Sequence, residues 1–135
     1  MTPQEPDEKQ ALVKLLLALL MSAALSATSA LAGGEFRHVV FFKFKDSATP
    51  EQVVEIEKAF AELSKKIPTI TGYEWGTSES VEKLNDGYTH CFFVSFKDKA
   101  ALEAYLPHEA HKAFGAKLKP LLEKAFVFDY TAKAE

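Results

Sequence analysis

The sequence has little of what marks several classes of protein. It contains one cysteine, Cys91, so a disulfide within one chain is excluded. Six glycines and six prolines among 135 residues are too few for a fibrous or low-complexity chain. The net charge of −3, without a clustered basic face, gives no indication of nucleic-acid binding. The composition is therefore that of an ordinary globular protein with one domain.

A long hydrophobic run is also missing. The apolar stretch from Leu15 to Leu25 is about 11 residues long, too short to cross a bilayer as a helix. It follows Lys14, and small residues, Ala30–Ala32, precede Gly33 as at a signal-peptidase site. We predict a signal peptide over residues 1–32, cleaved near Ala32, and a domain over residues 33–135. The mature protein is then periplasmic or secreted, without a membrane segment; an uncleaved stretch is instead an anchor.

The rest of the chain alternates between strand and helix patterns. Helical spacing starts after Thr49, which forms a capping box with Gln52, and continues to Ile67. Asp98 can cap a short helix ending at Tyr105, and Pro107 separates it from a second helix. That second helix is expected over 108–118, a turn over 85–87, and strands over 37–45, 70–78, 88–97 and 125–130. The order β-α-β-β-α-β predicts an α+β, ferredoxin-like subunit with a four-stranded antiparallel sheet.

The predicted sheet is apolar on both faces. In the third strand, His90, Phe92, Val94 and Phe96 alternate with Cys91 and Phe93, so large side chains point both ways. The helices can cover one face only. Each large apolar side chain left exposed to water loses the burial free energy of about 1.5–3 kcal/mol. We therefore predict a homodimer in which a second copy covers the other face. We also expect Cys91 to be a buried, unreactive thiol.

Four blocks of sequence, "HVVFFKFKD", "IPTITGYEWG", "DGYTH" and "YLPHEAHKAF", resemble the stress-responsive A/B barrel (Dabb) family. They fall in the family's order and cover nearly all of the chain from Arg37 to Tyr130. The resemblance implies a dimeric α/β barrel made of two ferredoxin-like subunits. In a polyketide cyclase of this family, a tyrosine and a histidine perform acid–base chemistry, and they correspond to Tyr105 and His111. Further pocket histidines correspond to His38, His90 and His108.

The residues themselves give a reason for this pairing. Tyr105 and His111 flank the break at Pro107, and an imidazole with a phenol is a reasonable acid–base pair near neutral pH. The alternative is that His108 and His111 only cap the helix and form hydrogen bonds. Glu109, where the family often has proline, could raise the pKa of a nearby imidazole. His38 and His90 lie on strands, where a satisfied core hydrogen bond competes with a pocket role.

Two further features, the "HEAH" segment and Trp75, bear on a metal site and on an aromatic pocket wall. "HEAH" has one residue too few between its histidines for the zinc-binding HExxH pattern, so we predict no metal and no cofactor. Trp75 is either a pocket wall or a core residue. We found no P-loop, dinucleotide fingerprint or nucleophile elbow.

Three functions remain open at this stage. The first is an exported homodimer that binds a small apolar or aromatic molecule in a pocket under the split helix, lined by His38, His90, His108 and Trp75. The second is a cofactor-independent, cyclase-like or lyase-like enzyme that uses Tyr105 and His111 as acid and base. The third is a structural oligomer that protects against stress. Fold alone cannot choose among them.

Overall fold

The computed structural model describes residues 34–134, which lie in the second of the chain's two units, Gly33–Glu135. The predicted signal peptide lies outside the described residues. The strands are β1 (Phe36–Phe44), β2 (Ile70–Thr77), β3 (His90–Phe96) and β4 (Leu122–Thr131), and the helices are α2 (Pro50–Lys66), α3 (Lys99–Tyr105) and α4 (Glu109–Leu118). None of these helices is long and apolar enough to cross a membrane.

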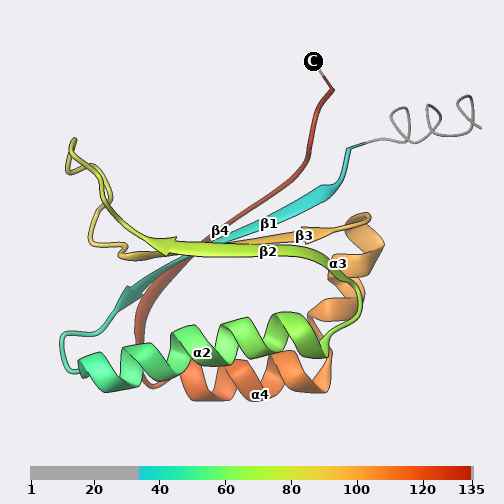
Figure 1. The fold of residues 1–135 in the computed structure, drawn as a ribbon. Helices are drawn as coiled ribbons and strands as arrows, with labels where there is room; N and C mark the ends of the chain where they lie inside the picture. Colours follow the sequence, from blue (N-terminus) through green and yellow to red (C-terminus); the bar gives the residue numbers. More distant parts are fainter. Residues whose placement is uncertain (1–33, 135) are drawn as a thin grey trace, which may run out of the picture. The chain divides into compact units, whose positions relative to one another are not determined.

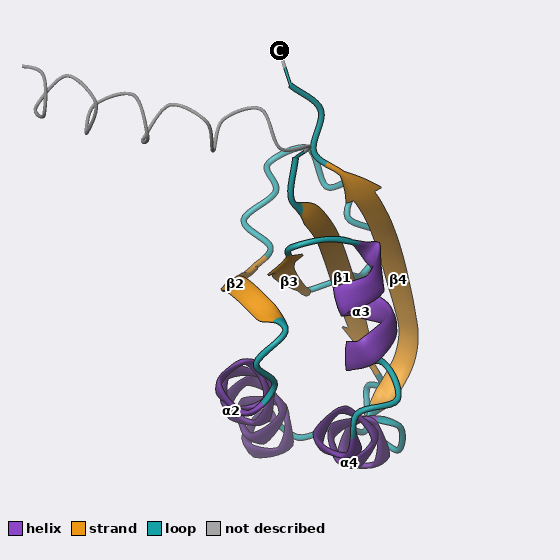
Figure 2. Cartoon of the chain, turned by 90° about the vertical axis from the view of Figure 1, so that its right-hand side faces the viewer, coloured by secondary structure: helices purple, strands orange, loops and turns teal. Residues whose placement is uncertain are grey.

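The four strands form one antiparallel sheet in the order β2-β3-β1-β4. Figure 1 shows α2 and α4 running side by side beneath this sheet. Figure 2 shows α3 on the side of the sheet that the other helices cover, and α3 packs against β1 and β3. The predicted ferredoxin-like fold with a split second helix is therefore confirmed.

Helix α2 begins and ends as its sequence predicts. The Thr49 hydroxyl accepts a hydrogen bond from the Gln52 backbone N–H, and the Gln52 side chain accepts one from the Thr49 N–H. Pro50 occupies the first turn, where its missing N–H costs nothing. The predicted stripe buries Ile56, Phe60 and Leu63 against the sheet. Each cap satisfies a group that would otherwise lack a partner at the helix end.

The segment after β3 forms two short helices instead of one. Asp98 caps α3 by accepting from the Ala101 N–H, and the chain turns at Pro107. Helix α4 starts at Glu109, one residue later than predicted, because His108 is its N-cap with an extended backbone. Leu106 is still helical and its N–H bonds to the Leu102 oxygen, but Pro107 has no N–H with which to continue the helix. The break brings the end of α3 close to the start of α4.

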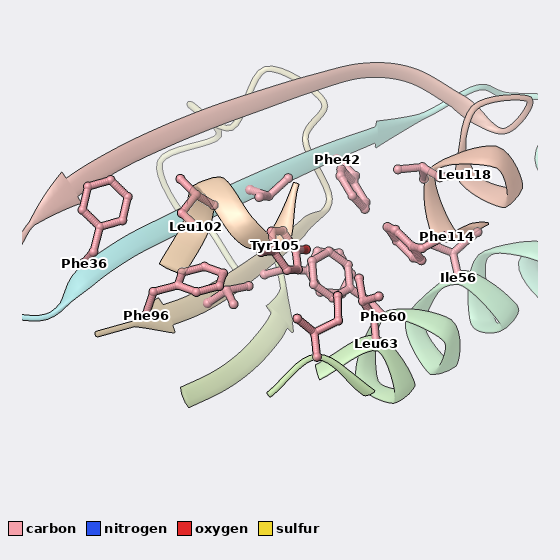
Figure 3. Packing of buried hydrophobic residues seen from close by; sticks show 14 residues of the cluster. Phe36, Phe42, Ile56, Phe60, Leu63, Phe96, Leu102, Tyr105, Phe114 and Leu118 are labelled. Atoms are coloured by element: carbon pink, nitrogen blue, oxygen red, sulfur yellow. The ribbon is translucent and has the colours of Figure 1, made fainter. Parts of the chain in front are cut away.

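The core lies between the sheet and the helices. Figure 3 shows Tyr105 packed among the aromatic and aliphatic side chains that fill this layer. Phe60 is stacked on Phe92 with ring centroids 4.3 Å apart, and it also meets Phe114 of α4. Stacked and edge-on aromatic contacts of this kind add to the free energy gained from burial.

The strand register decides which residues share a face. His38 pairs with Val94, and Phe42 pairs with His90, so both histidines lie on the face that the helices cover. The opposite face, which we call the open face, has no helix over it in the described residues. It carries Val39, Phe41, Cys91, Phe93, Phe126, Phe128 and Tyr130. Phe126 and Phe128 are 50% and 56% exposed.

Two sequence expectations need correction. Cys91 is half-buried and lies on the open face, so it is not a core thiol; its partial burial and nearby Glu74 raise its pKa. Strand β4 starts at Leu122, three residues earlier than the aromatic run beginning at Ala125 suggests. The backbone of Phe44 pairs with Leu122 across a bulge, and polar residues at 123 and 124 concealed this extension.

Candidate functional site

Three of the predicted site residues meet beneath the split helix. Tyr105 is the last residue of α3, His111 lies in the first turns of α4, and His38 comes from β1. The ring centroids of Tyr105 and His111 are 4.5 Å apart, and those of Tyr105 and His38 are 5.9 Å apart. We call Tyr105, His111 and His38 the Tyr105 cluster. The break at Pro107 produces it, because an unbroken helix would continue away from Tyr105.

Tyr105 is only 1% exposed. Its burial raises the pKa of the phenol well above the ordinary value, and the nearby Tyr73 hydroxyl raises it further. The phenol therefore remains protonated across the physiological range. In this state Tyr105 can donate a hydrogen bond to an oxygen atom that gains negative charge.

His111 is half-buried and has a defined tautomer. Its Nδ1 lies 2.9 Å from the backbone oxygen of Leu106, and since a carbonyl only accepts, Nδ1 carries the proton. Burial is the main cause that lowers the pKa of His111, with smaller contributions from His38 and His108; the Leu106 bond opposes them. Glu109 is exposed, and the expected rise in an imidazole pKa is wrong for His111. The ring is neutral near pH 7, with a free lone pair on Nε2.

His38 is buried and held by an acidic residue that the sequence reasoning missed. Its Nδ1 lies 2.6 Å from Oδ1 of Asp129, its partner on β4, and it donates to that carboxylate. The only sign of Asp129 as a possible partner in the sequence is that it is an acidic residue within the aromatic run "FVFDY". Only the β1-β4 register shows that it faces His38.

Tyr73 adds a polar group on the same face. It pairs with Val94 from β2, as His38 does from β1, so the three residues line up across the sheet. Its ring stacks on Phe60 at 5.6 Å, and burial together with Glu57 raises its pKa to about 12. Within residues 34–134, the Tyr73 hydroxyl and Thr69 Oγ1 are buried without a hydrogen-bond partner. Each such group costs about 1–3 kcal/mol.

The other predicted residues lie elsewhere. His108 is the N-cap of α4, its Nδ1 accepting from the Ala110 N–H at 3.1 Å, as the capping alternative predicts. His90 sits near the start of β3, four residues along the strand from Val94, where its Nε2 lies 2.9 Å from Glu57. Trp75 is 41% exposed and stacks on His90 with the rings nearly parallel. It is neither a core residue nor part of the Tyr105 cluster.

Two hollows of useful size open on the described part of the chain. One, of about 580 Å³, lies between α2 and α4. The other, of about 530 Å³, lies under the loop between β2 and β3. Neither is lined by Tyr105, His111 or His38, and Tyr105 and His38 are themselves buried.

Residues 34–134 contain no group of three His, Cys, Asp or Glu side chains placed to hold a metal ion. The Nδ1 atoms of His38 and His111 are instead hydrogen-bonded to Asp129 and to the Leu106 carbonyl, respectively. What the cluster offers is a hydrogen-bond donor, Tyr105, beside a neutral base, His111. That arrangement suits acid–base chemistry or the recognition of a carbonyl compound.

Comparison with known proteins finds relatives over most of the described residues. The chain is 37% identical over 99 residues to the stress-response A/B barrel domain-containing protein HS1 of Arabidopsis thaliana, covering 73% of this chain and 91% of that protein. It is 33% identical over 97 residues to olivetolic acid cyclase of Cannabis sativa, covering 72% and 96%.

A solved structure gives the same fold. The crystal structure of a dimeric ferredoxin-like protein of unknown function from Thermobifida fusca matches with a TM-score of 0.65 and 25% identity. The match covers 74% of this chain and 92% of that one. The sequence profile of the stress-responsive A/B barrel domain matches residues 36–132. The chain belongs to the stress-responsive A/B barrel domain family.

Proposed function

We propose that this protein is a homodimer that binds a small apolar or aromatic carbonyl compound between the split helix and the sheet, beside Tyr105. One observation carries the proposal: the Tyr105 cluster and the unpartnered Tyr73 hydroxyl converge on one patch of an otherwise apolar core. Small-molecule sites typically combine apolar walls with a few such polar groups. A ligand oxygen would satisfy the Tyr73 hydroxyl.

The open face supports the dimer. Its aromatic side chains form a continuous apolar surface over β1, β3 and β4, and apolar patches of this kind mark interaction sites. A second copy packing sheet on sheet would bury them. The structural neighbours of this chain are dimeric ferredoxin-like proteins.

Binding requires the split helix to move, because Tyr105 is closed off from solvent. Leu106 and Pro107, both exposed, connect α3 to α4; α3 packs only lightly on β1 and β3 compared with the packing between strands, and α4 packs on α2. Displacing them outward would open a path to Tyr105 while leaving the sheet intact. Short connecting segments with exposed residues are the usual places for such opening.

A Tyr73→Phe variant tests the proposed site. It removes the unpartnered hydroxyl, so the free protein should become more stable while ligands bind about five- to tenfold more weakly. Aromatic ketones and β-keto esters are titrated calorimetrically against both proteins. Tyr130→Phe removes the hydroxyl of a partly exposed tyrosine that lies outside the Tyr105 cluster and lines neither hollow, so it is the matched control and should change neither quantity. Equal ligand affinity in Tyr73→Phe and the unchanged protein would place the ligand elsewhere.

Acid–base catalysis is the second candidate, and the opposite pKa shifts of Tyr105 and His111 favour it. His111 Nε2 would take the proton from the carbon next to a carbonyl, leaving an enolate. The Tyr105 hydroxyl would donate to the enolate oxygen. Groups positioned in this way each contribute about 10²–10⁴-fold in rate. The 33% identity to olivetolic acid cyclase is consistent with such chemistry.

Exchange of the α-proton of a β-keto ester for deuterium, followed by NMR, tests the enzyme directly. The unchanged protein should accelerate exchange, and Tyr105→Phe and His111→Ala should each remove most of the acceleration. If the ligand binds but its α-proton exchanges at the uncatalysed rate, the protein is a binding module and not an enzyme for this reaction. If no ligand binds either, the remaining function is that of a stress-protective oligomer.

We further propose that residues 1–32 direct export and are removed near Ala32. The apolar stretch and the small residues before Gly33 support this. Cell fractionation with N-terminal sequencing is the test. A mature protein beginning at or near Gly33 outside the cytoplasm is expected, and an intact cytoplasmic chain contradicts the proposal.

A further inference from the structure

The hollow under the β2–β3 loop is separate from the Tyr105 cluster and has its own chemistry. Its volume of about 530 Å³ lies within the range of small-molecule pockets. Phe41, Leu84, Tyr88 and Phe126 supply apolar wall, and Phe126 touches both Phe41 and Tyr88, with ring centroids 5.9 and 6.4 Å apart. Leu84 is 78% exposed at the rim. The hollow can therefore take a flat aromatic ring.

A chain of hydrogen bonds ends in this hollow. His90 Nε2 lies 2.9 Å from Oε1 of Glu57, and an ionised carboxylate only accepts, so Nε2 carries the imidazole proton. In the neutral ring Nδ1 is then an acceptor, and it lies 2.7 Å from Thr89 Oγ1. The Thr89 hydroxyl must donate its single proton to His90.

The consequence is that Thr89 offers only lone pairs to the hollow. Thr89 is exposed and lines it, as do Asn85 and Asp86. The Asn85 amide nitrogen donates one of its two protons to the Tyr88 backbone oxygen at 2.9 Å, and its carbonyl oxygen is a further acceptor. The Asp86 carboxylate is an acceptor with negative charge. A ligand that satisfies Thr89 and Asp86 must donate hydrogen bonds, and the negative charge of Asp86 disfavours an anion.

We propose that this hollow binds neutral phenols, with the ring against Phe126 and the phenolic hydroxyl donating to Thr89. The proposal goes beyond the function proposed above, because it concerns a different site and the opposite hydrogen-bond polarity. The Tyr105 cluster offers a donor and suits a carbonyl oxygen, whereas this hollow offers acceptors. Aromatic carboxylates are disfavoured by Asp86.

The hollow adjoins the proposed dimer interface. Phe41, Cys91 and Phe126 line it and also belong to the open face. A second copy on that face would close the hollow from one side and remove the bound ring from water. The test is therefore made on the full-length protein at concentrations where it is fully dimeric.

Calorimetric titration with three matched probes tests the donor requirement. The probes are β-naphthol, its methyl ether and β-naphthoate. We expect β-naphthol to bind about five- to tenfold more tightly than the ether, which cannot donate, and naphthoate to bind weakest. Thr89→Val keeps the shape but removes the hydroxyl, so it should abolish the preference for β-naphthol over the ether. Thr89→Ser should restore it.

Variants of the two sites separate this proposal from the previous one. A Tyr105→Phe, His111→Ala double variant should bind β-naphthol unchanged, whatever becomes of the carbonyl ligands. Loss of β-naphthol binding in that variant would place the phenol in the Tyr105 cluster and overturn the proposal. So would equal binding of β-naphthol and its ether. Failure of the dimer to bind any probe would show that partner side chains fill the hollow, which also overturns it.

Discussion

At the scale of the residue, the Tyr105 cluster holds two ionisable groups in the protonation states that acid–base chemistry needs. Burial acts on both, but it keeps Tyr105 protonated and His111 unprotonated, since it always opposes the charged form. The Leu106 carbonyl fixes which nitrogen of His111 is free. Burial and one backbone bond thus set the protonation states of both groups.

The lowered pKa of His111 predicts a pH dependence of stability. Below the ordinary pKa of about 6.5, His111 binds a proton in the unfolded chain but not in the folded protein. The free energy of unfolding therefore decreases as the pH decreases. This contribution is complete above pH 6.5 and is lost as pH falls through the lower folded value. Urea unfolding over this range should show the slope, and His111→Phe should reduce it.

The same shift can be read directly by NMR. The ring protons of His111 should titrate with a midpoint below 6.5. A midpoint above 6.5 would mean that a carboxylate such as Glu109 controls the ring, contrary to the structure.

The pair of His38 and Asp129 should be energetically coupled. The two side chains are 2.6 Å apart, but the Asp129 carboxylate is partly exposed, so solvent screens the pair. We expect a coupling of about 0.5–1 kcal/mol in a double-mutant cycle with His38→Phe and Asp129→Ala, measured by urea unfolding. Additive effects of the two changes would show that Asp129 does not hold His38.

At the scale of the element, local sequence signals were sufficient for the helices. The capping box of α2 and the Asp98 cap of α3 depend on side chains within three residues of the backbone groups that they satisfy. Such signals are complete in one stretch of sequence. The strands are different, because their partners are distant. Asp129 facing His38, and Tyr73 in line with it, follow from register that no local pattern contains.

The pairing of Tyr105 with His111 lies between these cases. Pro107 predicted a break in the helix, and the family resemblance implied the acid–base roles of Tyr105 and His111. The residues alone could not decide whether His111 or His108 contacts Tyr105. The structure separates them because His108 is held as the N-cap, while His111 falls on the side of α4 that faces Tyr105. For Trp75 the core alternative is wrong, because the ring is 41% exposed and stacks on His90 of the neighbouring strand.

The Thr49 cap should have a measurable effect on α2. Thr49→Ala removes the acceptor for the Gln52 N–H and should lower the free energy of unfolding by about 1 kcal/mol. Ser47→Ala, in the same exposed turn but outside the capping box, is the control and should change it little. Equal effects of the two substitutions in urea unfolding would show that the cap is not what stabilises the helix start.

At the scale of the whole molecule, the proposed dimer uses the open face as its interface. Phe128 is exposed on it, whereas Val54 is an exposed apolar residue on α2, away from the sheet. Phe128→Glu places a charge in the proposed interface, where it would have to be desolvated, and should shift the dimer towards monomer. Val54→Glu should leave the dimer unchanged. Sedimentation equilibrium measures both, and equal behaviour of the two variants would exclude the sheet face as the interface.

The central claim is that two copies form a barrel and hold a small molecule beside Tyr105. Native mass spectrometry of the expressed full-length chain tests it most directly, because one spectrum reports both the number of subunits and any non-covalent mass. We expect a dimer that carries a carbonyl compound, either one bound during expression or an added aromatic ketone or β-keto ester. The occupancy should be lower in the Tyr73→Phe variant. A monomer, or a dimer whose bound mass is indifferent to Tyr73, would contradict it.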